Sequence, residues 1–328
     1  MMDFVYHEPR TVKEALSLLK EFRGDARIKA GGTDLLVKMK QATMKLEHLV
    51  NLKNMADLVY IRHLPKEGLK IGALTTLSDI EGSAILRDKF NILWRVASKV
   101  ASPQLRNRAT LGGNICLDSR CPYYNQSRQW LGNLDPCYKR GGKRCYVLAN
   151  GGPAKCYSIF SADTVPALIL QKAKVKLVNF ERERVVPIED LYTGVGMKVN
   201  RILPDEILAE IQIPERNGLE RSTYLKLSER GELDFPTLGV AVSTVLDQHE
   251  MLEEVNVVIV GTGPRPIRLS NIGGMLKGLT LDFEVISKAC EGIPEMVYPI
   301  SNAFGLAQYK AKVLPSFVAR GIMEAAAS

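Results

Sequence analysis

The sequence predicts a mixed α/β (α+β) fold of two or three domains with a sizeable core. Stretches with helical spacing of apolar residues alternate with short apolar strands along the whole chain. The 328 residues are 46% hydrophobic and 24% charged, as in ordinary globular proteins. There is no apolar run of roughly eighteen residues, and the first ten residues are too polar for a signal peptide. We therefore expect a cytoplasmic protein without a membrane span, in which thiols stay reduced.

Residues 1–60 are predicted to form a small α/β unit. Thr11 and Glu14 have the spacing of a capping box at a helix start. The helix that follows has one apolar face, formed by Val12, Ala15, Leu16, Leu19 and Phe22. A short strand at 27–30, a helix through Met39 and a strand at 49–52 complete the unit.

Two further units are predicted beyond it. In residues 61–215, Thr76 and Asp79 mark a helix start, and a second helix covers about 92–100. Strands of this unit are expected at 69–73, 173–179 and 206–213. Residues 220–328 are expected to contain strands at 238–246 and 255–260, followed by helices at about 269–277, 282–290 and 303–326.

Two glycine-rich loops are the first candidate binding features. One lies in the segment Lys29–Leu36, which reads KAGGTDLL, and the other spans Thr110–Asn114, which reads TLGGN. Adjacent glycines allow positive φ and close approach to a ligand, and successive N–H groups in such turns suit a pyrophosphate. Neither loop is GxGxxG or GxxxxGK[ST], which disfavours nicotinamide and nucleoside-triphosphate sites. The alternative is a pair of ordinary turns.

Four cysteines follow the second loop, namely Cys121, Cys137, Cys145 and Cys156. Four thiolates are what an iron–sulfur cluster needs, and the absence of a CxxC pair disfavours a zinc ribbon. Zinc, a disulfide-stapled loop and a simply cysteine-rich loop remain alternatives. Cys290 lies on a predicted helix and is expected to be a buried thiol.

The basic charge of the chain is concentrated near these cysteines. Residues 120–156 hold seven basic residues against one acidic residue, a net charge of +6 out of the +8 of the whole chain. Such a surface suits an acidic electron-transfer partner better than nucleic acid, although the charges could also serve only solubility. The four histidines have no ligand spacing, and there is no GxSxG or HExxH, so hydrolytic chemistry is not indicated.

Three motifs together resemble one family. The stretches AGGTDLL at 30–36, RNRATLGGNI at 106–115 and SADTVPAL at 161–168 resemble the FAD-binding subunit of molybdenum hydroxylases, the xanthine dehydrogenase family. The resemblance implies a p-cresol-methylhydroxylase-type FAD domain over 1–215, with subdomains 1–60 and 61–215, and a family-type C-terminal domain over 220–328, a small sheet with helices. The last two motifs are almost adjacent in most relatives, whereas the insertion 120–156 separates them here. This insertion resembles that of the 4-hydroxybenzoyl-CoA reductase β subunit.

The resemblance also implies the site residues. The phosphate and ribityl cradle would comprise Lys29, Ala30, Gly31, Gly32, Thr33, Asp34, Leu35 and Leu36, and the second phosphate loop Thr110, Leu111, Gly112, Gly113 and Asn114. Val100 would be an apolar contact near the flavin and Asp163 would meet the adenosine end. Leu208 and Lys226 would flank the isoalloxazine, unless they are a core leucine and a surface lysine. A [4Fe–4S] cluster would be held by Cys121, Cys137, Cys145 and Cys156, while Cys116, where the family often has a small residue, is excluded.

The function implied by the resemblance is electron transfer, with no catalytic residue on this chain. Electrons from a ferredoxin-like donor would reach [4Fe–4S] and FAD, then [2Fe–2S] centres on a small partner subunit. A large partner subunit would carry the molybdenum cofactor and dehydroxylate 4-hydroxybenzoyl-CoA, in a dimer of heterotrimers. The alternative within the family is oxidation of another aromatic, heterocyclic or aldehyde substrate. A zinc-stabilised basic binding module is the non-enzymatic alternative.

Overall fold

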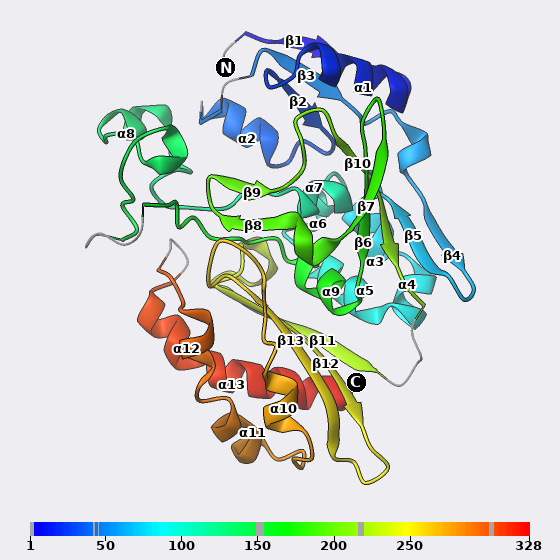
Figure 1. Cartoon of the computed structure of the whole chain (residues 1–328), viewed down its shortest axis with the longest axis vertical. Helices are drawn as coiled ribbons and strands as arrows, with labels where there is room; N and C mark the ends of the chain where they lie inside the picture. The colour runs from blue at the N-terminus through cyan, green and yellow to red at the C-terminus, as the bar shows by residue number, and fades with distance from the viewer. Residues whose placement is uncertain (1–2, 42, 45, 149–153, 216–219, 302–304) are drawn as a thin grey trace.

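The computed structural model describes residues 3–41, 43–44, 46–148, 154–215, 220–301 and 305–328. In this part of the chain, a parallel sheet, a five-stranded antiparallel sheet and a four-stranded antiparallel sheet follow one another. They succeed each other along the long axis of the molecule (Figure 1). The predicted mixture of helices and strands is therefore confirmed.

The first sheet has the strand order β1-β3-β2. Its elements are β1 (Val5–His7), α1 (Val12–Glu21), β2 (Ala26–Lys29), α2 (Leu35–Lys40) and β3 (His48–Asn51), followed by the 3-10 turn η1 (Ala56–Leu58). Thr11 caps α1 as predicted, since its hydroxyl accepts from the N–H of Glu14 at 3.1 Å. The Glu14 carboxylate, however, accepts from the N–H of Arg10 at 2.7 Å, so the predicted reciprocal capping box is only half formed.

The second sheet has the order β4-β5-β10-β6-β7, so its central strand, β10, is the last of the five in the sequence. Its strands are β4 (Ile61–Leu64), β5 (Gly68–Gly72), β6 (Lys174–Val178), β7 (Glu183–Pro187) and β10 (Ile207–Ile213). The helices of this unit are α3 (Leu77–Glu81), α4 (Ala84–Lys89), α5 (Asn91–Ser98), α6 (Pro103–Arg106), α7 (Leu111–Ile115) and α9 (Thr164–Leu170). Residues of β5, β6, β10, α5 and α9 share one apolar core. At Thr76 the predicted capping box with Asp79 is complete.

Two small elements lie beside this sheet. The 3-10 turn η3 (Ile188–Leu191) precedes a hairpin of β8 (Tyr192–Val195) and β9 (Lys198–Asn200). The hairpin extends toward the segment that carries the four cysteines, residues 120–159 (Figure 1). Its turn contains Gly196, whose carbonyl accepts from Lys139 at 2.8 Å.

The third sheet, β11-β12-β13-β14, packs against the C-terminal helix. Its elements are β11 (Arg221–Leu227), η4 (Gly231–Leu233), β12 (Leu238–Leu246), β13 (Leu252–Val260), β14 (Ile267–Arg268), α10 (Ile272–Leu276), α11 (Phe283–Ala289), α12 (Ile293–Val297) and α13 (Ala307–Ala326). The two predicted strands are present, whereas β11 and α12 were not predicted. The predicted start of the last helix, at 303, lies outside the described residues.

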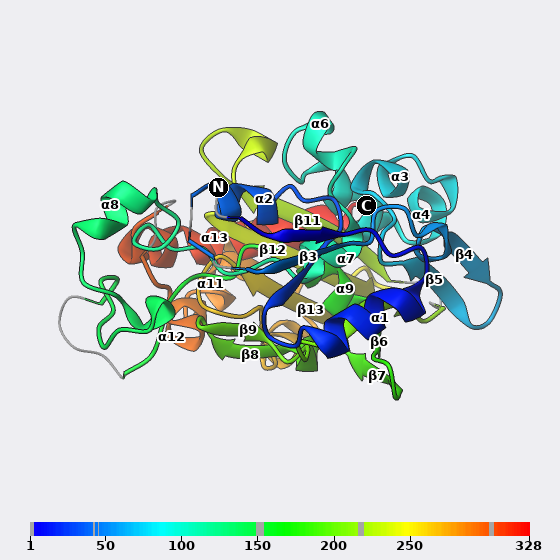
Figure 2. The same cartoon turned by 90° about the horizontal axis from the view of Figure 1, so that it is seen from above.

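The cysteine segment leaves the second unit at Arg120 and returns at Ile159. These two residues exchange backbone hydrogen bonds of 2.7 and 2.8 Å, which close the base of the segment. Within it are α8 (Arg128–Gly132) and the 3-10 turn η2 (Tyr138–Arg140). Figures 1 and 2 both show α8 at one end of the molecule, away from α3 and α4. No helix among the described residues is long and apolar enough to cross a membrane.

Candidate functional site

The first glycine loop lies in direct contact with the residues that lead into the second. A Cβ added at Gly31 would lie 1.8 Å from the backbone oxygen of Arg108, two residues before the second loop. Gly32 has φ +79°, a left-handed conformation that favours glycine. The first loop therefore needs its two glycines for different reasons: Gly31 for the close approach of the Arg108 backbone, and Gly32 for its positive φ.

Free backbone donors are found in the first loop. Within the described part of the chain, the N–H groups of Gly32, Thr33 and Asp34 donate to no backbone carbonyl. Three successive N–H groups of this kind form the nest expected around a phosphate. Lys29 lies at its edge and donates to the side-chain oxygen of Asn51 at 3.0 Å. Burial, and then the nearby cations Lys53 and Arg108, lower the pKa of Lys29.

The second loop differs from the expectation of an open, positive-φ turn. It forms the short helix α7, and neither Gly112 nor Gly113 has positive φ. The N–H groups of Leu111 and Gly112 donate to carbonyls of Thr75 and Ala73 at 2.9 Å, and that of Gly113 donates to the Thr110 hydroxyl at 3.0 Å. A Cβ at Gly112 would lie 2.7 Å from that of Ala73. Its glycines thus provide room, while its donors are used within the protein.

Asp163 connects the second loop to the C-terminal sheet. The next residue, Thr164, donates through its hydroxyl to Asn114 at 2.6 Å. The Asp163 carboxylate accepts from the Tyr224 hydroxyl at 2.6 Å and from the Lys226 ammonium at 3.2 Å, both on β11. Burial raises the pKa of Asp163, and the ammonium and hydroxyl oppose this effect. The structure brings Asp163 and Lys226 to one point, although the resemblance assigns them to different parts of FAD.

The remaining two predicted flavin contacts are buried apolar side chains. Val100 follows α5, and its carbonyl accepts from Arg106 at 3.2 Å. Leu208 lies on β10, at the bulge opposite Leu177. Both belong to the core cluster of the second unit. Leu208 is therefore a core leucine in this structure, which is the alternative to a flavin contact that the sequence analysis gave for it.

The four predicted cysteines line one cavity. Cys121, Cys137, Cys145 and Cys156 surround it together with Tyr123, Tyr124, Tyr138, Lys139, Arg144, Tyr146 and Ser158. All four are free thiols, while Cys116 and Cys290 lie elsewhere. Burial raises the pKa of the Cys121 thiol to about 12; the other three cysteines add to this and a backbone hydrogen bond opposes it.

The donor set fits an iron–sulfur cluster in number and kind. Four thiols face one space, and two basic side chains on its wall suit the negative charge of thiolate ligands. Among the described residues, however, no group of three or more His, Cys, Asp or Glu side chains has the arrangement of a metal site. The thiols would have to draw together around an ion.

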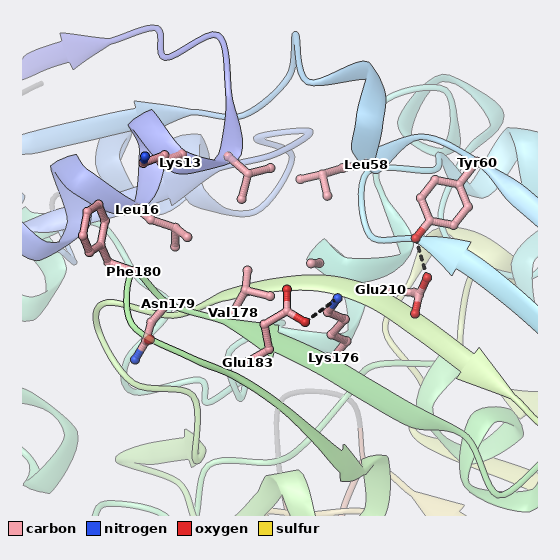
Figure 3. A pocket seen from close by; sticks show the side chains of 12 residues that line it. Lys13, Leu16, Leu58, Tyr60, Lys176, Val178, Asn179, Phe180, Glu183 and Glu210 are labelled. Carbon is pink, nitrogen blue, oxygen red and sulfur yellow. Dashed lines mark hydrogen bonds and ion pairs between the residues drawn. The ribbon is translucent and has the colours of Figure 1, made fainter.

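A separate cavity of about 550 Å³ lies between α1 and the second sheet (Figure 3). None of the predicted site residues lines it. Its acidic groups already have partners, because Tyr60 donates to Glu210 at 2.6 Å and Lys176 contacts Glu183 at 2.7 Å. Its walls come from four separate stretches of sequence, which explains why no sequence pattern indicated it.

Residues that the sequence did not indicate link the first loop to the cysteine segment. They are Lys38, Asp118, Ser119, Arg120, Lys139 and Ser158. The sequence signals were the spacing of Asp34 and Lys38, four residues apart, and the basic charge of residues 120–156, which includes Arg120 and Lys139 and was interpreted as a partner surface.

Comparisons with known proteins agree with this arrangement. Residues 2–216 match the family model "FAD binding domain in molybdopterin dehydrogenase", and residues 223–325 match "CO dehydrogenase flavoprotein C-terminal domain". The chain is 26% identical to the nicotinate dehydrogenase FAD-subunit of Eubacterium barkeri, covering 94% of this chain and 92% of that protein. It is 28% identical to the carbon monoxide dehydrogenase medium chain of Afipia carboxidovorans, covering 99% and 97%.

A solved structure shows the same fold. The reconstituted CO dehydrogenase from Oligotropha carboxidovorans contains a chain that matches with a TM-score of 0.79 and 27% sequence identity. The match covers 99% of the present chain and 98% of that chain.

Proposed function

The chain belongs to the family with the FAD binding domain of molybdopterin dehydrogenases, and on that premise we propose that it is the FAD-carrying, electron-transfer subunit of a molybdenum-dependent oxidoreductase complex. The observation that carries the proposal is the close contact of the first glycine loop with the residues just before the second, where Gly31 leaves no room for a Cβ against Arg108. FAD bound there would supply one- and two-electron redox chemistry.

The residues of this chain bind and orient the cofactor. The N–H groups of Gly32, Thr33 and Asp34 would hold the diphosphate, with Lys29 adding positive charge. Substrate conversion would take place on partner subunits, a large one with the molybdenum cofactor and a small one with [2Fe–2S] centres. The curated relatives act on nicotinate and carbon monoxide by name. Nicotinate is a heterocycle, and oxidation of an aromatic, heterocyclic or aldehyde substrate is the first proposal for the complex.

The experiment is purification of the full chain, alone and with its co-purifying subunits. We expect about one FAD per chain, released by denaturation and identified by chromatography, and molybdenum in the complex. Flavin-free protein that does not take up added FAD would overturn the proposal.

A second candidate is favoured by the four thiols around one cavity. It is the subunit of a 4-hydroxybenzoyl-CoA reductase-type complex, in which Cys121, Cys137, Cys145 and Cys156 would hold a [4Fe–4S] cluster. Such a cluster supplies one-electron transfer. Arg144, which is exposed at the cavity wall, and the +6 charge of residues 120–156 would attract an acidic ferredoxin-like donor.

Two measurements separate the candidates. If the second candidate is correct, the anaerobically purified protein should contain about four irons per chain. Its complex, once reduced by an electron donor, should consume 4-hydroxybenzoyl-CoA. Zinc in place of iron, or a complex that only oxidises its substrate, would exclude the second candidate and leave only the first.

A further inference from the structure

A hydrogen-bonded path begins at one wall of the cysteine cavity. The Cys156 thiol donates to the Ser158 hydroxyl at 3.3 Å, and that hydroxyl lies 2.5 Å from the Ser119 hydroxyl. Both hydroxyl oxygens also lie within hydrogen-bond distance of the Gly196 carbonyl, at 3.2 and 3.1 Å, so one hydroxyl donates to this carbonyl while the other donates to its neighbour. Gly196 has no space for a side chain, since a Cβ there would lie 2.3 Å from the Ser158 hydroxyl. The β8–β9 hairpin thereby fixes this end of the path.

Lys139 continues the path into the protein. Its ammonium donates to Ser119 at 2.7 Å, to Asp118 at 2.6 Å and to the Gly196 carbonyl at 2.8 Å, which uses all three of its protons. The side chain is only 5% exposed, and it also lines the cysteine cavity. Lys139 follows Cys137 by two residues. A movement of Cys137 therefore shifts Lys139 and alters the three hydrogen bonds that the Lys139 ammonium donates.

Two carboxylates complete the path to the first glycine loop. Asp118 accepts from Lys139 on one oxygen and from Lys38 at 2.9 Å on the other. Lys38, 3% exposed, also pairs with Asp34 of the first loop at 3.1 Å. The other oxygen of Asp34 is bound by Arg120, the residue before Cys121. Both ends of the cysteine segment are thus tied to the loop that carries the free N–H groups.

We propose that this network, Asp34–Lys38–Asp118–Lys139 with Arg120, couples the two cofactor sites, so that iron binding at the cysteines and FAD binding at the first loop strengthen each other. The inference rests on the proposed function and on the cluster assignment within it. Metal binding orders the chain that carries its ligands. Because the same ion pairs hold the loop, ordering one site reduces the entropy cost of ordering the other. The effect must be reciprocal.

The test measures FAD affinity in two states of the full chain. The dissociation constant is obtained from flavin fluorescence, first in iron-free protein and then after anaerobic reconstitution with ferrous iron and sulfide. Wild-type protein should bind FAD at least about five-fold more tightly when it is loaded with iron than when it is iron-free, which is the lower end of typical coupling between two binding sites. Lys139→Met should bring this ratio close to one. Lys155→Met is the matched control, because Lys155 also neighbours a cysteine but is exposed and lies over the Tyr157 ring.

Asp118→Asn is a second variant, which keeps the side-chain volume and removes the charge. Its ratio of FAD affinities in loaded and iron-free protein should also fall close to one. Circular dichroism verifies that each variant is folded, so that a ratio is compared only between folded proteins. A ratio of one in the wild type, or an unchanged ratio in folded Lys139→Met and Asp118→Asn, overturns the coupling alone. Protein that binds FAD but no iron overturns the cluster assignment together with the coupling, while the FAD proposal stands.

Discussion

Replacing Gly31 by alanine is the sharpest test of the flavin site. The added Cβ would lie 1.8 Å from the Arg108 oxygen, whereas ordinary contacts begin at 3.4 Å, so the loops must separate by about 1.6 Å. The neighbouring atoms are backbone and cannot turn aside. Overpacking of this kind costs about 1–3 kcal/mol. If FAD needs both loops in their present positions, its affinity should fall by about 5- to 150-fold.

The assay is titration of flavin-stripped protein with FAD, together with thermal unfolding of each variant. Gly274→Ala is the control, because that glycine lies in α10 with no neighbouring atom within 4 Å of an added Cβ. It should leave FAD affinity unchanged. Wild-type affinity in folded Gly31→Ala would refute the assignment of FAD to these loops.

Three further predictions concern the domain contact and the cysteines. Asp163→Ala removes the acceptor of two buried donors on β11 and should lower the free energy of unfolding by about 3–5 kcal/mol; an unchanged urea midpoint would contradict this. Cys137→Ser should lose iron and bind flavin about as weakly as iron-free wild-type protein, whereas Cys290→Ser should keep iron and wild-type flavin binding, as measured by iron content and flavin titration. Because burial raises the pKa of Cys121 to about 12 and ligands bind as thiolates, iron affinity should rise from pH 7 to pH 9 in chelator competition; equal affinity would argue against thiolate ligation.

Local features of the fold were predictable because their signals are local. The capping box at Thr76 and the strands at 69–73 and 238–246 follow from spacing and periodicity, and the structure contains them. The central position of β10 between β5 and β6 does not follow from any short pattern. It depends on which strands pair across more than a hundred residues, here Ile211 with Ile71.

The site was predictable as a set of segments, but its contacts were not. The cysteines were recognised from their number, and the structure gathers them around one cavity. The glycines were expected to serve positive φ, whereas at Gly31 and Gly112 the reason is lack of space. Asp118 lies in an irregular segment and Lys139 in a single 3-10 turn, neither of which has a sequence periodicity, so their pairing could be found only in three dimensions. Roles assigned to individual FAD contacts stay predictions.

The closed base of the cysteine segment has a consequence for how such a chain evolves. Arg120 and Ile159 are already neighbours across an antiparallel bridge. A stretch whose two attachment points are adjacent can be gained, lengthened or lost with little change to the chain on either side, since only loop closure is altered. A flavoprotein ancestor could acquire four thiols in one genetic event while its nucleotide cradle kept its shape.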